Sequence, residues 1–361
     1  MRIMILGAAV SNHTIRWANS LAERNHEVYL VCRGDQRARK ENTNIHNSVK
    51  IYYLRYGGGM GYYLNVPEFK RLFKSIQPDV VNAHYATGYA ALARLAKAKP
   101  LIISFWGSDI FDFPFRNSYN KRLLWHNIQY ADGIASTSLA MANKIREVYP
   151  SLQKEICVTP FGVNTDLFKP VFRSDNPRPI IGIVKYLEPI YDIPLLLNAF
   201  AIIKNKFNPH PLLHIYGGGS LLGDLKKLCD ELNITEDVTF FGTIPNAEIA
   251  RAINSMDVFV NCSKTESFGV ALVEAMACAV PVVATDTEGF REVVEDGVTG
   301  VILKDRKPET MANEIIKLLN DKEKSKEYGN NGRKRVLELY DWNNNVIVME
   351  ELYRKVSDCR L

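Results

Sequence analysis

The stretch TESFGVALVEAMA, residues 265–277, carries the strongest signal in this sequence. Two glutamates, Glu266 and Glu274, flank a Ser-Phe-Gly turn and an apolar run. Ser267 suits an N-cap, so we expect a helix to begin here with free backbone N–H groups and its positive dipole end facing outward. Such a helix start binds anions. A carboxylate among apolar residues is costly unless it is paired or bonds a ligand's hydroxyls. The stretch therefore suits a nucleotide diphosphate and its ribose.

This stretch resembles the Glu-x7-Glu signature of retaining glycosyltransferases of family 4, and the apolar run 281–286 follows it as a buried strand. The resemblance is specific over 262–286 and looser in the first half. It implies an α/β GT-B architecture, with two doubly wound parallel-sheet (Rossmann-like) domains facing a cleft. The last helix is expected to cross back to the first domain. The implied activity is metal-independent transfer of a sugar from a nucleotide diphosphate sugar, with no other cofactor.

Short apolar runs alternate with helical patterns along the chain, which is typical of parallel α/β structure. We expect an acceptor-binding domain at 1–170 together with 341–361, and a donor-binding domain at 171–340. Residues 161–179 are rich in proline and polar residues and are interpreted as the linker. Strands are expected near residues 2–7, 27–32, 49–54, 79–83, 100–105, 133–136, 156–159, 180–185, 212–216, 238–242, 257–261, 281–285 and 300–303.

The net charge of +5 conceals an asymmetry between the two halves. Residues 1–170 hold 22 Lys and Arg against 12 Asp and Glu, a net of +10, and the remainder holds 23 against 28, a net of −5. A basic first half predicts an anionic partner. We favour an anionic membrane surface over nucleic acid, because no nucleic-acid recognition motif accompanies the charge.

Two segments, 68–74 and 116–125, mix basic and bulky apolar residues in the manner of interfacial helices. The alternative is that their apolar residues face the core and their charged residues are simply solvated. The six cysteines show no metal-binding spacing, so we expect no structural metal. We expect a cytoplasmic protein, placed at the inner face of the membrane if the interfacial helices bind lipid.

A glycine turn, 217–219, closes an expected strand and precedes a helix, and glycines there let backbone N–H groups approach a pyrophosphate. The resemblance places the donor's phosphates at this turn and at the Ser-Phe-Gly turn, the nucleobase after the next strand, and the ribose at the second glutamate. The donor-binding residues so implied are Gly217, Gly218, Gly219, Thr243, Ile244, Ser267, Phe268, Gly269, Val270 and Glu274.

The implied catalytic residues are Glu266, which would contact the donor sugar's hydroxyls, and Lys185, which would stabilise the departing diphosphate. The family typically has a second lysine five residues later, but this chain has Ile190 there, and Asp192 stands where glycine is usual. Lys264 could supply the missing charge, or it is a surface lysine without a role.

The first domain departs from the family pattern as well. Trp106 replaces the histidine that usually contacts the donor sugar, and Asp109 remains as a sugar-facing catalytic candidate. Asn12, His13 and His84 are further candidates on the acceptor side, although a lone histidine often serves only local hydrogen bonding.

Two alternative functions stay open at this point. One is a non-hydrolysing nucleotide-sugar epimerase on the same two-domain plan, against which the full Glu-Ser-Phe-Gly signature argues. The other is a non-catalytic nucleotide-sugar binder, which Ile190 and Trp106 motivate. For the transferase, the acceptor would be a lipid-linked or polysaccharide (cell-surface glycan) intermediate bound by the basic first domain.

Overall fold

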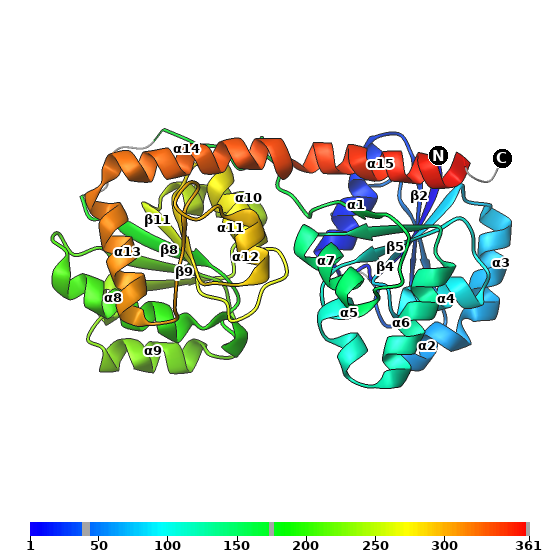
Figure 1. Ribbon diagram of the computed structural model, residues 1–361, viewed down its shortest axis with the longest axis horizontal. Helices are drawn as coiled ribbons and strands as arrows, with labels where there is room; N and C mark the ends of the chain where they lie inside the picture. Colours follow the sequence, from blue (N-terminus) through cyan, green and yellow to red (C-terminus); the bar gives the residue numbers. More distant parts are fainter. Residues whose placement is uncertain (38–43, 173–176, 359–361) are drawn as a thin grey trace. The chain divides into compact units, whose positions relative to one another are not determined.

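The structure, a computed structural model, describes residues 1–37, 44–172 and 177–358 (Figure 1). It consists of two compact units. Unit 1 is Met1–Phe161 with the segment from Asn343 onward, and unit 2 is Gly162–Trp342. Each unit contains one parallel sheet between helices, so the α/β architecture expected from the alternating pattern is confirmed.

Unit 1 has a seven-stranded sheet of order β3-β2-β1-β4-β5-β6-β7. Its strands are β1 (Arg2–Leu6), β2 (Glu27–Cys32), β3 (Lys50–Tyr53), β4 (Val80–His84), β5 (Leu101–Phe105), β6 (Gly133–Ser136) and β7 (Ile156–Val158). Its helices are α1 (Asn12–Glu23), α2 (Gly58–Leu64), α3 (Val66–Ile76), α4 (Gly88–Leu95), α5 (Ser108–Phe111), η1 (Phe113–Phe115), α6 (Ser118–Tyr130) and α7 (Leu139–Val148). Strands β4, β5 and β6 are buried along their whole length because helices cover both faces of the sheet.

Unit 2 has a six-stranded sheet of order β10-β9-β8-β11-β12-β13. Its strands are β8 (Ile180–Val184), β9 (Leu212–Tyr216), β10 (Val238–Gly242), β11 (Val258–Asn261), β12 (Val282–Ala284) and β13 (Val301–Ile302). Its helices are η2 (Pro189–Tyr191), α8 (Ile193–Lys206), α9 (Leu222–Glu231), η3 (Thr235–Asp237), α10 (Asn246–Asn254), α11 (Val270–Ala277), α12 (Glu288–Val293), α13 (Pro308–Asn320) and α14 (Lys322–Leu339). Leucines and isoleucines of α8 and α13 pack against the central strands in the core.

The last helix, α15 (Trp342–Asp358), packs into unit 1, as the resemblance implied (Figure 1, red). The buried Asn82 amide of β4 donates to the Tyr353 hydroxyl at 2.7 Å. The carboxylate of Glu350, only 5% exposed, bonds Arg24 Nε at 3.0 Å and His26 Nε2 at 2.7 Å. These polar contacts attach the end of the chain to its beginning.

The expected linker is largely part of unit 2. Val163 N donates to Tyr340 O at 2.8 Å, Trp342 N donates to Val163 O at 2.9 Å, and the Phe168 ring is 2% exposed. Residues 173–176 of the expected linker lie outside the described residues. In the described parts of the chain, no helix has the length and apolarity needed to span a bilayer.

Candidate functional site

In unit 2, Lys185 and Glu266 meet at the carboxyl edge of the sheet. Lys185 follows β8 and Glu266 follows β11, and these two strands are neighbours at the point where the strand order reverses. Lys185 Nζ lies 2.6 Å from Glu266 Oε2, and the two side chains are only 14% and 18% exposed. The ammonium also lies 4.6 Å from the centre of the Tyr191 ring. Two charged groups are therefore held together where open α/β sheets bind ligands.

The turn after Glu266 is fixed by its packing. The Phe268 ring is 2% exposed and meets the Tyr340 ring edge-on at 5.3 Å, so the ring anchors the turn in the core. Gly289 N donates to Glu266 O at 3.1 Å, and a Cβ atom placed on Gly289 would lie 2.5 Å from Phe268 N. Sequence reasoning missed Gly289, the second residue of α12 (Glu288–Val293), because no motif in the sequence pointed to it.

The prediction that Ser267 caps the helix is wrong. Helix α11 begins at Val270, its N-cap is Gly269, and no side chain caps it. The reason is that the chain turns at Gly269, whose φ of 106° suits glycine, while Ser267 N instead donates to the carboxylate of Glu266 at 3.2 Å. Leu272 N is the first amide to bond back to Gly269 O, at 2.9 Å. The earlier amide of Val270 thus still lies at the positive helix end.

Glu274 is the fifth residue of α11 and is half-buried, while Leu272, Val273, Ala275 and Met276 of the same helix are buried. Glu274 follows Val270 by four positions, so the two share a helix face. The carboxylate is therefore presented one turn below the amide end of the same helix.

The turn 217–219 follows β9 and is held close to the backbone after β8. A Cβ atom on Gly217, whose φ is +133°, would lie 2.0 Å from Lys185 O, and one on Gly219 would lie 2.4 Å from Leu187 O. A Cβ atom on Gly218 would meet only the Thr243 hydroxyl, at 3.2 Å. Two of the three glycines are thus required by packing inside the protein, which the phosphate argument did not anticipate.

Two further contacts join the loops at this edge. Both oxygens of Glu188 accept bonds from Ser220, one from its backbone N at 2.9 Å and one from its hydroxyl at 2.6 Å. Gly217 N donates to Gly242 O at 2.8 Å, which ties the glycine turn to the end of β10. The exposed Thr243 and half-buried Ile244 come directly after that point. The structure thus gathers the predicted donor-binding residues on the loops after β9, β10 and β11.

The departures at 190 and 192 have a local explanation. Asp192 has a φ of 49°, a left-handed conformation that favours glycine, the residue that the family usually has at this position. The Asp192 carboxylate pairs with Arg306. Arg306 also donates to Ser263 O at 3.0 Å. Ile190 is 46% exposed, and its carbonyl accepts from Lys264 N at 2.8 Å. Lys264, an exposed residue, is therefore adjacent to the position where the family's second lysine is missing.

In unit 1, the predicted aromatic and histidine residues lie together after β1, β4 and β5. The Trp106 ring centre is 4.4 Å from that of His84, 6.0 Å from that of His13 and 5.3 Å from that of Phe161. His13 stacks on Phe161 at 3.9 Å. Burial lowers the pKa of His13 to about 4 and that of His84 to about 3. Both imidazoles are therefore uncharged near neutrality.

Asp109 lies beside this cluster and is only 1% exposed. Its carboxylate accepts bonds from the backbone amides of Ala86 at 3.1 Å, Trp106 at 3.2 Å and Gly107 at 2.9 Å. Burial raises its pKa to about 6, although these amide bonds oppose the shift. Through these hydrogen bonds Asp109 connects the loop after β4 to the loop after β5. Tyr85, in the first of these loops, has a φ of 70° and is 39% exposed.

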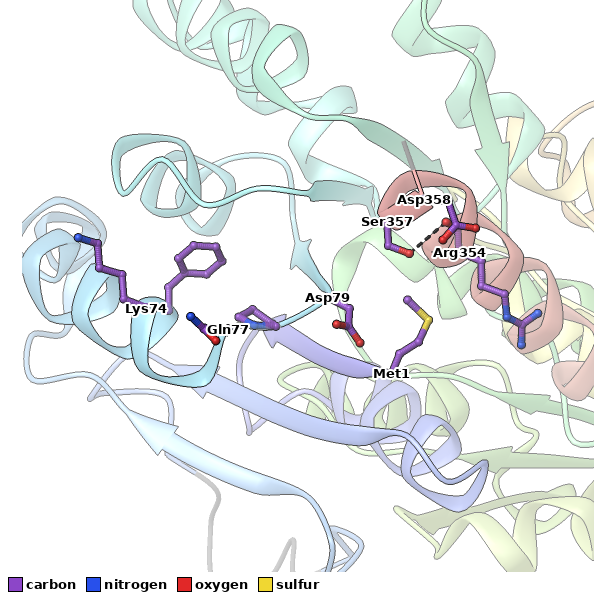
Figure 2. Close-up of a pocket in the computed structure, with 9 residues that line it drawn as sticks. Met1, Lys74, Gln77, Asp79, Arg354, Ser357 and Asp358 are labelled. Atoms are coloured by element: carbon purple, nitrogen blue, oxygen red, sulfur yellow. Dashed lines mark hydrogen bonds between the residues drawn. The ribbon is translucent and has the colours of Figure 1, made fainter. Parts of the chain in front are cut away.

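Asn12 is the first residue of α1 and is exposed at the same edge. A separate pocket of about 1050 Å³ lies at the opposite, amino-terminal edge of this sheet (Figure 2). Met1 and Asp79, which precede β1 and β4, line it together with Arg354 of α15. None of the predicted site residues belongs to this pocket, so it is distinct from the candidate site.

Two protein-family models match this chain. Residues 164–335 match the family model of glycosyl transferases group 1, and residues 2–138 match that of glycosyl transferase 4-like proteins. An uncharacterized glycosyltransferase of Methanocaldococcus jannaschii is 26% identical over 331 residues, 88% of this chain and 86% of that protein. The N-acetyl-alpha-D-glucosaminyl L-malate synthase of Bacillus anthracis is 26% identical over 358 residues, covering 93% and 91%.

Solved structures share the fold across the whole chain. Sucrose-phosphate synthase from Thermosynechococcus elongatus has a TM-score of 0.81 at 20% identity, covering 99% of this chain and 100% of that one. Anabaena HepE, solved with UDP and glucose, has a TM-score of 0.76 at 18% identity, covering 99% and 100%. The family matches and named relatives favour neither an epimerase nor a mere binder. The chain is a glycosyltransferase with the GT-B fold.

Proposed function

We propose that this enzyme is a retaining, metal-independent glycosyltransferase that uses a nucleotide diphosphate sugar, UDP- or GDP-linked in the first instance. The observation that carries the proposal is the Lys185–Glu266 pair at 2.6 Å, beside the amide end of α11 and on the strand-order reversal of unit 2. A cation and helix amides suit the diphosphate, whereas a carboxylate suits sugar hydroxyls.

In this proposal the diphosphate binds at the amino end of α11 and at the Gly217–Gly219 turn, and Glu274 accepts from the ribose hydroxyls. As negative charge develops on the leaving phosphate, the Lys185 ammonium contacts that phosphate, and its ion pair with Glu266 weakens. The bond between the anomeric carbon and the phosphate oxygen breaks, and the acceptor oxygen attacks from the same face. The acceptor's proton passes to the departing phosphate. Glu266 orients the donor sugar and forms no covalent bond.

For the acceptor, we propose a lipid-linked or polysaccharide intermediate bound at the carboxyl edge of unit 1. Tyr85, which is 39% exposed, and the half-buried His13 offer ring surfaces there, both packed on the buried Trp106, and sugar rings pack readily on aromatic faces. Asp109 positions these rings through the backbone amides of Trp106 and Gly107. We place the reaction at the cytoplasmic face of a membrane.

The test begins with a thermal-shift panel of UDP-, GDP-, ADP- and TDP-sugars, each with and without EDTA. A ligand that binds the folded state raises the free energy of unfolding, by about 2.7 kcal/mol at a concentration one hundred times its Kd. The melting temperature rises accordingly. The donor so identified is then incubated with acceptor extract, and NMR of the product reports the anomeric configuration. An inverted product, or a sugar that changes without any acceptor, would contradict the proposal.

A further inference from the structure

Tyr191 is a third member of the charged group at the carboxyl edge of unit 2, although it is not among the residues that the sequence predicted for the site. It ends η2 and is half-buried. The Lys185 ammonium lies 4.6 Å from the centre of the Tyr191 ring and 2.6 Å from the Glu266 carboxylate. We call these three residues the lysine trio.

The Tyr191 backbone is fastened to the loop that carries Glu266. Cys262 Sγ donates to Tyr191 O at 3.2 Å, and Lys264 N donates to Ile190 O at 2.8 Å. Both donors belong to the loop after β11, so the aromatic ring and the carboxylate are mounted on backbone segments that hold each other. The lysine of the trio, with its long flexible side chain, is therefore the member that can move between them.

The Tyr191 hydroxyl stays protonated in this setting. Burial raises the pKa of Tyr191, and the negative charge of Glu266 raises it further. An uncharged phenol presents the negative face of its π system to a cation, and such a contact attracts an ammonium group. The ring is therefore a neutral partner for the Lys185 ammonium, whereas Glu266 is a charged one.

Elsewhere in the chain the same kinds of partner surround more exposed lysines, of which Lys99 is one. Lys99 Nζ lies 2.7 Å from Asp132 Oδ1 and 4.9 Å from the centre of the Tyr130 ring, at the amino edge of the unit-1 sheet. Its side chain and that of Asp132 are 45% and 31% exposed, against 14% and 18% for the lysine and the carboxylate of the trio. Water screens an exposed pair, whereas a ring contact with a desolvated ammonium is worth more. Burial at the strand-order reversal therefore distinguishes the lysine trio from an ordinary surface pair.

A neutral partner suits a lysine that serves a leaving group. The Glu266 carboxylate and a phosphate compete for the ammonium, because both are anions. The Tyr191 ring carries no charge, so it can stay in contact while the ammonium turns toward the phosphate. Holding the ammonium matters more here than in the family pattern, since Ile190 stands where a second lysine is usual.

We propose that Tyr191 is a positioning residue for the sugar transfer. Its ring holds the Lys185 ammonium where the diphosphate departs, so that one lysine serves where the family usually has two cations. This inference rests on the proposed function, in which Lys185 stabilises the leaving diphosphate. Tyr191 acts through Lys185, and its hydroxyl is not required.

The experiment is a double-mutant cycle of Tyr191→Leu and Lys185→Ala, measured by steady-state kinetics on the identified donor. Tyr191→Leu should lower kcat/KM about tenfold, the value of a cation–π contact at a largely desolvated site, and the loss should appear in kcat. Tyr191→Phe keeps the ring and should stay within about twofold of the parent chain. In the Lys185→Ala background, Tyr191→Leu should change the rate less than about twofold, because the ring then has no ammonium to hold.

Tyr130→Leu is the matched control, because it removes a half-buried ring from Lys99 in the other unit. Its kcat/KM should stay within about twofold of the parent chain. Circular dichroism and melting temperature check that all variants fold. If Tyr191→Leu does not fold, Tyr191→Met, whose flexible side chain fills similar space, replaces it in the cycle. An unchanged rate in Tyr191→Leu, a Tyr191→Phe variant that is equally slow, or equal losses in both backgrounds would overturn the proposal.

Calorimetric titration with the nucleoside diphosphate product gives a second cycle that needs no acceptor. Tyr191→Leu should weaken its binding about fivefold in the parent chain and less than about twofold in the Lys185→Ala background. Equal weakening in both backgrounds would contradict a role that passes through Lys185.

The Lys185→Ala variant separates this proposal from the proposed function. If Lys185→Ala loses sugar transfer while Tyr191→Leu keeps it, the proposed function stands and the role of Tyr191 fails. If Lys185→Ala transfers sugar at the rate of the parent chain, the proposed role of Lys185 fails, and that of Tyr191 fails with it.

Discussion

At the carboxyl edge of unit 2 the charged groups are paired and partly accessible, whereas at the same edge of unit 1 the titratable groups are buried. Lys185 and Glu266 pair at 2.6 Å with 14% and 18% of their side chains exposed. His84 and Asp109, in contrast, are each 1% exposed, and burial shifts their pKa values to about 3 and about 6. The edge of unit 2 holds charged side chains that a bound ligand can contact. The edge of unit 1 is rigid and largely aromatic.

The variant Lys185→Ala gives the strongest test of the claim that the charge at the edge of unit 2 is used in the reaction. Loss of one cation at a developing diphosphate should reduce kcat/KM by about 10²–10³-fold, by analogy with the loss of one oxyanion donor. The melting temperature should change little, because the paired Glu266 can reach water. Steady-state kinetics on the identified donor provide the measurement. An unchanged rate would show that the charge at this edge is not used in catalysis.

Lys264→Ala is the matched control for that variant. Its backbone amide bonds Ile190 O, but its side chain is exposed and forms no ion pair among the described residues. A rate within about twofold of the parent would identify it as a surface lysine. A loss comparable to that of Lys185→Ala would show that the two lysines share the leaving-group charge.

Gly217→Ala tests whether the unit-2 edge depends on tight backbone packing. The added Cβ atom would lie 2.0 Å from Lys185 O at a φ of +133°, so we expect a loss of about 2–3 kcal/mol in the free energy of unfolding. Gly218→Ala meets only the Thr243 hydroxyl at 3.2 Å and should retain stability. Chemical denaturation measures both. Equal stability of the two variants would contradict the packing explanation.

The buried groups of unit 1 predict a pH dependence of stability. His13 and His84 have folded pKa values of about 4 and about 3 against an ordinary 6.5, so the unfolded chain binds more protons in this window and stability rises from pH 4 to 6.5. Asp109 acts in the opposite direction. Its pKa of about 6 exceeds the ordinary 3.8, so its contribution falls as the pH rises through that range.

His13→Phe isolates one of these contributions while keeping a ring against Phe161. The gain in unfolding free energy between pH 4.5 and pH 7 should be smaller than in the parent chain by about 2 kcal/mol. Urea unfolding at the two pH values measures it, and His126→Gln, at an exposed position on α6, serves as control. An unchanged pH dependence would mean that the imidazole is not desolvated as the structure places it.

The smallest expected effect belongs to Glu274→Ala. Removal of a carboxylate that accepts from ribose hydroxyls should weaken nucleotide binding about tenfold, the value of one charged hydrogen bond, and should leave the fold intact. Calorimetric titration with the nucleotide measures the affinity. Glu274→Gln keeps the shape and should show an intermediate loss. Unchanged affinity in Glu274→Ala would remove this residue from the donor site.

Most of the fold could be predicted from local patterns. The expected strands at 133–136, 212–216 and 238–242 match β6, β9 and β10 to the residue, because short buried runs end at turn residues. Boundaries that depend on tertiary contacts were less predictable. Residues 161–179 were expected to form the interdomain linker, yet Val163 pairs with Asp341 in a bridge, since segments distant in sequence supply its partners.

The sequence predicted which residues form the candidate site better than it predicted their structural roles. Lys185 and Glu266 are 81 positions apart, and only their strands' adjacency brings them together. Ser267 was expected to cap α11, but a left-handed Gly269 begins the helix instead. The support from Gly289 could not be derived, because close approach of one backbone to another leaves no signature in composition or periodicity.

The return of α15 to unit 1 has a consequence for the order in which the enzyme is built. As the ribosome releases the chain, unit 2 has all its residues before the segment carrying Glu350 and Tyr353 has emerged. Until then Asn82 lacks its buried hydroxyl partner, and His26 lacks its carboxylate. The half that is synthesised first is therefore the half that is completed last.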